Sequence, residues 1–302
     1  MIRLYDARTG RDEVIRPVHP GELRMLASAP PVSEEAHFRQ LRFWLQPDLI
    51  RRFAERRGLM VTVCEISSPA GEPSATALHD TRISLNIHPA EHVLPASEPV
   101  TRIIEFVEPG HAGQAPGSTA PARLAPGELP VFDIGLGGEG EDRQRVADPA
   151  LTGHVAARTG PVTFEGREVA APGESMIGLR DVTGRGLDPL ALRLAFLGRR
   201  YRDPLDLTWE MLQEAGGTLL RWRERVAEWA RSPSTPMSRR YADAVVAAFG
   251  DDLNTPAALR ELSHLEPDDT ELAGTKFETF AAMDRLLGLD LAAGLSTGTA
   301  AG

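Results

Sequence analysis

Residues 21–67 place a helical segment between two short apolar runs, and this order constrains the fold more than any other feature. The runs "GELRMLAS" and "MVTVCEIS" are each predicted to form a short strand. Between them, "AHFRQLRFWLQPDLIRRFAERRG" has helical periodicity and ends at Gly58. A strand, a helix and a second strand in this order predict an α/β fold with a parallel sheet. Pro47 lies inside the helical segment, so we expect a kink or a break there.

Further apolar runs extend the α/β part of the chain. Two are strand candidates, "RISLNIH" (82–88) and "TRIIEFV" (101–107), and "VFDIGLGG" (131–138) is typical of a buried strand that runs into a glycine turn. "PVTFEGREV" (161–169) predicts a β-hairpin that turns at Glu165 and Gly166. Residues 108–130 are rich in proline and glycine and predict an irregular surface loop.

From Asp188 onward the pattern becomes helical. Asp188 is a suitable N-cap, and Pro189 stands at the first helical position. Four segments carry apolar residues at three- and four-residue spacing: "DPLALRLAFLGRRY", "LTWEMLQEAGGTLLRWRERVAEWARS", "SRRYADAVVAAFG" and "TKFETFAAMDRLLGLDL". We therefore predict an α/β domain over 1–187, a helical bundle over 188–291 and a disordered tail over 292–302.

Composition excludes several classes of site. The net charge of −10 disfavours non-specific nucleic-acid binding, which depends on basic side chains. Cys64 is the one cysteine, so an internal disulfide and a cysteine-rich zinc site are both excluded. Lys276 is the one lysine among 33 basic residues, which leaves the first 275 residues without a lysine to hold phosphate. No apolar run approaches the roughly 20 residues that span a bilayer, and the start "MIRLYDARTG" does not resemble a signal peptide, so we expect a cytoplasmic protein without membrane contact.

Several longer strings together resemble one known family. They are "RLYDARTG", "PGELRM", "DLIRRFAERRGLMVT", "GLDPLALRLAFLGRRYRDPLDLTWEML" and "FGDDLNTPAAL". They resemble cysteinyl-tRNA synthetase and the related actinobacterial ligases that couple cysteine to an amino sugar. The resemblance covers residues 2 to about 291, with a shortened middle. It implies a class I Rossmann-like domain followed by a helical stem-contact domain, and we expect no anticodon-binding domain because the chain ends about where one would begin.

The resemblance also implies where ATP would bind, and this sequence departs from the family there. A His-Ile-Gly-His or His-Ile-Gly-Asn signature contacts the ATP phosphates in the family, and the matching residues begin at His37. The glycine is Arg39 and the fourth residue is Gln40. A side chain as large as arginine at a close-approach glycine is expected to block the usual position of the nucleotide.

The second family motif, Lys-Met-Ser-Lys-Ser, has lost both lysines. A gap-free match places Glu168, Val169, Ala170, Ala171 and Pro172 there. Cationic groups at developing phosphate charge commonly contribute several kcal/mol to catalysis. A carboxylate in the first lysine position adds repulsion to that loss.

The third family feature is a zinc site that binds the thiol of cysteine. The first ligand position corresponds to Ser28, the second to Phe106, and the histidine-rich segment is reduced to "GGEGEDR". These residues offer neither thiolate nor imidazole, so no tight zinc site of that kind is expected. We therefore predict no metal site and no ATP or zinc cofactor.

A ligand site at the carboxyl ends of the strands is still expected. Asp133, Gly137 and Gly138 match the family's Asp-Ile-His-Gly-Gly-Gly strand end, although Gly135 and Leu136 differ from it. Ligands of open α/β sheets bind at such strand ends. We predict no catalytic residue and assign substrate binding to a set of five residues: His37, Gln40, Asp133, Gly137 and Gly138.

Other clusters allow two interpretations each. Six arginines crowd the first long helix and form either a solvated face or an anion or partner site: Arg39, Arg42, Arg51, Arg52, Arg56 and Arg57. Three tryptophans at helical spacing favour core or interface packing over base stacking: Trp209, Trp222 and Trp229. His88 and His92 have the spacing of a helical metal pair, but Pro89 and the lack of a third ligand favour coincidence.

Two hypotheses of function follow. The favoured one is a pseudoenzyme that has lost ATP-dependent cysteine activation and binds a small metabolite in the old cleft or a partner protein. A tRNA acceptor arm is a less favoured partner. The alternative is a repurposed enzyme of specialised metabolism that carries out another ligation or acyl transfer, for example from aminoacyl-tRNA. No cysteine, lysine or histidine–carboxylate grouping indicates a replacement catalytic apparatus, which favours the first hypothesis.

Overall fold

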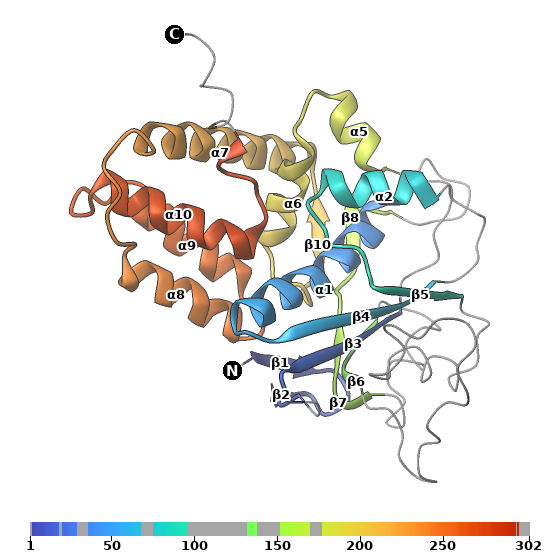
Figure 1. Ribbon diagram of the computed structural model, residues 1–302. Coiled ribbons are helices and arrows are strands. Elements are labelled where there is room, and N and C mark those ends of the chain that lie inside the picture. The colour runs from blue at the N-terminus through green and yellow to red at the C-terminus, as the bar shows by residue number, and fades with distance from the viewer. Residues whose placement is uncertain are drawn as a thin grey trace, which may run out of the picture.

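A parallel sheet lies beside a group of helices in the computed structural model (Figure 1). The structure describes residues 2–17, 20–28, 36–67, 75–95, 132–137, 152–169, 177–293 and 295. The predicted strand at 101–107, the predicted loop at 108–130 and Gly138 lie outside these residues. In the described part, no helix is both long and apolar enough to cross a membrane.

In the described part of the chain the sheet has five strands, all parallel, in the order β5-β4-β3-β6-β7. Their bounds are β3 Glu22–Ser28, β4 Met60–Ser67, β5 His92–Pro95, β6 Phe132–Gly137 and β7 Thr152–Arg158. The chain moves outward from β3 through β4 to β5, then returns to the other side of β3 for β6 and β7. The predicted α/β class is confirmed, and the order reverses between β3 and β6.

The helix α1 (Phe38–Arg56) joins β3 to β4 and contacts both strands, with α10 on its other side (Figure 1). It runs through Pro47 without interruption, so the predicted break is wrong, and a kink there stays a prediction. Proline removes one hydrogen bond from a helix and crowds the preceding turn. Here the neighbours Trp44, Leu45, Leu49 and Ile50 are all buried, and their packing outweighs that cost.

Residues 82–88 are not a strand, and this prediction is wrong. The helix α2 (Ala75–Ser84) covers the first part of the segment, and Asn86 follows it with a left-handed φ of 53°. Leu85 and Ile87 are buried on the turn after the helix, and this alternation imitates a strand pattern.

Two small sheets flank the main one. One is the hairpin of β1 (Ile2–Asp6) and β2 (Arg11–Ile15). In the other, β8 (Val162–Phe164) pairs with β9 (Arg167–Glu168) and with β10 (Leu205–Leu207). Glu165 and Gly166 both have positive φ, at 50° and 74°, as a two-residue hairpin turn requires, so the predicted hairpin is confirmed.

The helices of the second half are α5 (Leu179–Gly184), α6 (Pro189–Leu197), α7 (Trp209–Trp229), α8 (Arg239–Gly250), α9 (Thr255–Leu265) and α10 (Ala273–Leu287). Asp188 caps α6 by accepting a hydrogen bond from the Leu190 amide at 2.8 Å, as predicted. Trp222 and Trp229 are buried against Phe280, in agreement with a packing role. The division of the chain into domains at residue 187 stays a prediction.

Gly160 lies where the α/β part meets the turn before β10. A Cβ atom at this position would lie 2.5 Å from the carbonyl oxygens of both Arg202 and Asp203. We expect Gly160→Ala to lower the free energy of unfolding by about 1–3 kcal/mol, because the backbone must shift to admit a methyl group. Urea denaturation measures this loss.

Gly217 supplies the matched control for that substitution. It lies exposed inside α7, and a Cβ atom there would meet nothing within 4 Å. Gly217→Ala should stabilise the helix by about 0.5–1 kcal/mol. Equal effects of the two substitutions would contradict the close approach at Gly160.

Candidate functional site

The strand order reverses between β3 and β6, and at the carboxyl edge of an open parallel sheet a ligand crevice is expected at such a point. There Ser28, at the end of β3, lies opposite Gly137, at the end of β6. Ser28 is 1% exposed, and among the residues that the structure describes its Oγ has no hydrogen-bond partner. Ligands of open α/β sheets bind where the strand order reverses, so this edge is the candidate site.

The start of α1 lies on the same side of the sheet and is closed by a reciprocal capping box. His37 is the N-cap, and its Nδ1 accepts a hydrogen bond from the Gln40 amide at 3.4 Å. Gln40 Oε1 accepts one from the His37 amide at 3.1 Å. Both residues are buried, with 6% and 0% of their surface exposed. The two predicted substrate-binding residues are therefore brought together, and both are engaged in starting the helix.

His37 carries no charge near neutral pH. Burial, together with a smaller effect of the positive charge of Arg39, lowers its pKa from 6.5 to about 4. An Nδ1 atom that accepts a hydrogen bond also requires the unprotonated form at that nitrogen. The imidazole consequently offers no positive charge to a phosphate.

The lowered pKa of His37 predicts a pH-dependent stability. The unfolded chain takes up a proton near pH 6.5 and the folded chain only near pH 4. The contribution of His37 to the free energy of unfolding is thus complete above about pH 6.5. It is lost as the pH falls toward 4, by about 3 kcal/mol at most. His37→Asn keeps an N-cap acceptor but does not titrate. Urea denaturation at pH 7 and pH 4.5 should show a smaller loss for this variant, and an identical loss would contradict the assignment.

The segment after residues 168–172, which match the second family motif, returns to the start of α1. Gly178 forms an isolated antiparallel bridge with His37 and donates its amide to Asp181 Oδ2 at 2.8 Å. Upstream, Glu168 is exposed at the end of β9. Ala170, Ala171 and Pro172 lie outside the described residues. The chain therefore places Gly178, six residues after Pro172, beside His37.

The predicted substrate-binding residues of β6 lie at different ends of the strand. Gly137 is the last residue of β6 and lies beside Ser28 at the carboxyl edge of the sheet. Asp133 lies near the beginning of the same strand, is fully buried, and accepts the Arg24 amide at 2.9 Å through Oδ2. The structure thus gives Asp133 a role in holding β3 to β6, and its contact with a substrate stays a prediction.

The arginines of α1 are mostly structural. Arg42 is buried and donates to the carbonyl oxygens of Gly160, Pro161, Arg200 and Asp203 at 2.8–3.2 Å. Arg51 is also buried and binds Glu91 at 2.6 Å. The solvated-face interpretation is therefore wrong for both, whereas Arg56 and Arg57 are exposed.

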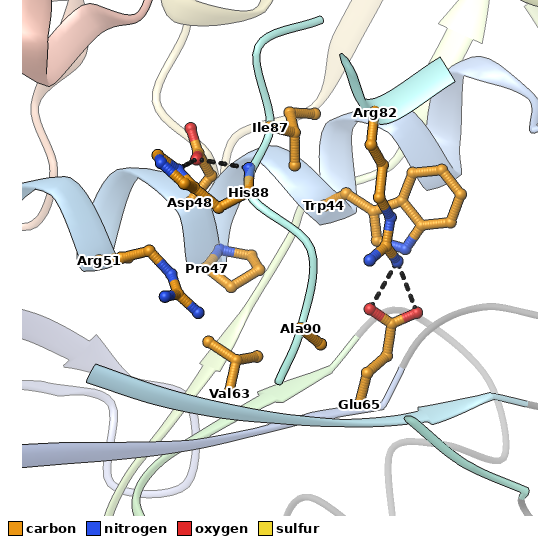
Figure 2. Close-up of a pocket in the computed structure, with 10 residues that line it drawn as sticks. All are labelled: Trp44, Pro47, Asp48, Arg51, Val63, Glu65, Arg82, Ile87, His88 and Ala90. Atoms are coloured by element: carbon orange, nitrogen blue, oxygen red, sulfur yellow. Dashed lines mark hydrogen bonds and ion pairs between the residues drawn. The ribbon is translucent and has the colours of Figure 1, made fainter. Parts of the chain in front are cut away.

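A second hollow lies between α1, β4 and residues 87–90 (Figure 2). Arg82 Nη2 contacts both carboxylate oxygens of Glu65, at 2.8 and 2.6 Å, and its guanidinium lies 4.3 Å from the centre of the Trp44 ring. Across the hollow is Arg51, which binds Glu91. These charges are paired within the protein, so the hollow offers a charged ligand little to bind. The sequence offered no signal for the Glu65–Arg82 pair.

The two histidines at 88 and 92 do not form a helical metal pair. His88 Nδ1 lies 2.6 Å from Asp48 Oδ1 (Figure 2), and His92 is the first residue of β5. Among the described residues, no group of three or more histidine, cysteine, aspartate or glutamate side chains could hold a metal ion.

The fold defines an α/β protein with an open parallel sheet whose strand order reverses at the candidate site. No family model matches the sequence. The chain is similar to the L-cysteine:1D-myo-inositol 2-amino-2-deoxy-alpha-D-glucopyranoside ligase of Streptomyces griseus, with 36% identity over 115 residues, which are 36% of this chain and 27% of that protein. It is also 36% identical over 101 residues to the Cysteine--tRNA ligase of Paracoccus denitrificans, which covers 33% of this chain and 21% of that protein.

These relatives confirm the predicted resemblance to cysteine ligases. A third relative, the same cysteine–amino sugar ligase from Thermobispora bispora, matches 54% of this chain at 29% identity and 41% of its own length. The chain thus spans between a fifth and about two fifths of these relatives. Among solved structures, the arginyl-tRNA synthetase of Thermus thermophilus aligns over 93% of this chain and 83% of its own, with 14% identity and a TM-score of 0.45.

Proposed function

We propose that this ligase-like chain does not activate cysteine with ATP and acts by binding, with the crevice between β3 and β6 as its ligand site. The observation that carries the proposal is the state of His37. Its imidazole is buried, uncharged and engaged with Gln40, where the family's signature would contact ATP phosphates. A group in that state contributes little to binding a triphosphate.

The charge around the site supports the same proposal. Arg39 is partly buried at the position of the family's close-approach glycine, and a side chain there competes with the nucleotide for space. The exposed carboxylate of Glu168 stands at the position of the first lysine in the family's second motif. Pyrophosphate leaving this site would meet repulsion in place of a clamp.

The residues that match the family's zinc site do not fit zinc. The buried Ser28 offers a hydroxyl oxygen, and the matching positions supply no thiolate or imidazole. A buried hydroxyl without a partner instead suits a hydrogen bond to a polar ligand, because leaving it unsatisfied costs about 1–3 kcal/mol. We infer a small polar metabolite as the ligand of this crevice, and a partner protein is the second possibility.

Calorimetric titration of the whole chain with magnesium ATP, alone and in the presence of cysteine, tests the proposal. The Paracoccus denitrificans cysteine–tRNA ligase serves as the positive control. We expect no ATP binding by this chain at about 1 mM nucleotide, since each missing phosphate contact removes about 1.5–3 kcal/mol. ATP binding that is lost in the His37→Ala variant would contradict it and would favour the repurposed enzyme.

A further inference from the structure

Lys276 is the one lysine among these 302 residues, so lysine-directed chemistry has a single target in this chain. It lies in the first turn of α10, which packs against α7 and α8 (Figure 1). The function proposed above does not use it. The accessibility of this one side chain therefore decides whether the chain can carry a lysine modification.

The folded chain encloses the Lys276 side chain. The residue is 7% exposed, and its Nζ donates to the carbonyl oxygen of Glu266 at 2.9 Å. The same nitrogen lies 5.6 Å from the centre of the Trp229 ring, where a cation is attracted to the aromatic face. Glu266 is the C-cap of α9 and Trp229 is the last residue of α7, so the ammonium group joins the ends of two helices to α10.

Further contacts hold α10 in place around Lys276. Trp229 packs against Phe280, with ring centres 5.2 Å apart. In the first turn of the helix, the hydroxyl groups of Thr275 and Thr235 share a hydrogen bond at 2.9 Å. Separating Lys276 from its partners therefore breaks several contacts together, and a cooperative opening of this kind is rare in the folded state.

Acylation of a lysine requires an approach that this arrangement does not allow. The neutral amine attacks the carbonyl carbon of an activated acyl donor, such as a thioester, and the two atoms must first come within about 3–3.5 Å. A nitrogen–carbon bond then forms, the carbon–sulfur bond breaks, the thiolate leaves with the bonding electrons and the amine proton passes to water. An enclosed amine that is bound to Glu266 is not presented to a donor held by an enzyme.

The product of acylation fits the folded state poorly. An amide nitrogen carries no positive charge for the Trp229 ring, and the acyl group adds atoms to a side chain that is already enclosed. Close-packed interiors admit extra atoms only when their neighbours shift, which is destabilising. An acylated chain is therefore expected to repack less stably than an unmodified one.

We propose that Lys276 is an acylation site that opens only when α10 separates from the ends of α7 and α9. Its substrates are activated acyl donors such as thioesters, and acylation at this residue marks chains whose helical half has opened. The acylated chain then closes less stably, so the modification favours the opened state. The site is independent of the ligand site at the sheet edge and of the function proposed there.

Acetylation of the whole chain with the N-hydroxysuccinimide ester of acetic acid tests access to the amine, with peptide mass spectrometry as the readout. Arg285→Lys is the matched control, because it places an exposed lysine on the same helix and keeps the charge. Each rate is divided by the rate of the same lysine in concentrated urea. We expect Lys276 in the folded variant to react at least about tenfold more slowly than the lysine introduced at position 285, since only the opened fraction reacts. A smaller difference overturns the proposal.

The stability of the acetylated chain forms the second arm of the experiment. The chain is acetylated in urea, returned to buffer and unfolded again by urea. We expect its midpoint to lie at a lower urea concentration than the midpoint of the unmodified chain. Lys276→Arg, treated in the same way, should show no such difference, which controls for reaction at the α-amino group. An acetylated chain whose midpoint equals that of the unmodified chain overturns the proposal as well.

Discussion

Asp48→Ala is expected to lower the free energy of unfolding by about 3–5 kcal/mol, because it leaves buried arginines without their counter-charge. The Asp48 carboxylate accepts Arg193 Nη2 at 2.6 Å, Arg52 Nε at 2.9 Å and the His88 amide at 3.0 Å. Burial alone would raise its pKa, but Arg193, His88 and Arg52 together hold the pKa well below its ordinary value. The carboxylate therefore stays ionised in the folded protein.

Arg193 makes this loss large, because it joins four parts of the chain. It is 1% exposed and also donates to the carbonyl oxygens of Leu85, Asn86 and Leu287. Without Asp48, the guanidinium stays buried with a net charge. The exposed pair Arg225–Glu228, at 3.0 Å, supplies the control.

Urea denaturation measures both variants. Glu228→Ala should cost less than about 0.5 kcal/mol, because solvent screens that pair. A loss at Asp48 no larger than the loss at Glu228 would contradict the role assigned to the buried carboxylate.

Trp222→Ala is expected to cost about 3–5 kcal/mol, the usual loss when a large aromatic side chain is removed from a core. The indole is 1% exposed and packs edge-on against Phe280, with ring centres 5.6 Å apart. Its Nε1 donates to Glu266 at 2.9 Å, so truncation also removes a hydrogen bond. The same denaturation experiment measures the loss.

Trp209 is the matched control for this prediction. It is only partly buried, lies 5.1 Å from the Phe164 ring and supports Arg185 on its face at 3.8 Å. Trp209→Ala should cost about 1–2 kcal/mol, since part of its surface already contacts solvent and less apolar area is lost. A larger loss at Trp209 than at Trp222 would show that the helical core is centred elsewhere.

Local sequence signals identified the elements whose causes are local. Asp188 with Pro189 marked the start of α6, and Glu165 with Gly166 marked the hairpin, because capping and turn formation depend on neighbouring residues. The strand predicted at 82–88 is wrong because the buried Leu85 and Ile87 alternate on a turn rather than on a strand. The break predicted at Pro47 is wrong because tertiary packing maintained the helix.

The sequence predicted where the candidate site lies, but not the contacts that its side chains make. The motif match placed His37 and Gln40 at the helix start, and the structure adds their mutual hydrogen bonds. The role of Arg42 was hidden, because its carbonyl partners lie 118 to 161 residues away in the chain. Main-chain acceptors leave no trace in residue identity, so sequence alone suggested a solvated arginine.

Cysteine-dependent exchange of pyrophosphate into ATP tests the central claim most directly, because it reports the activation step without any acceptor. The Paracoccus denitrificans cysteine–tRNA ligase again provides the positive control under the same conditions. We predict exchange by this chain at the level of the protein-free background, with and without cysteine. Cysteine-dependent exchange above that background, abolished by His37→Ala, would contradict the account.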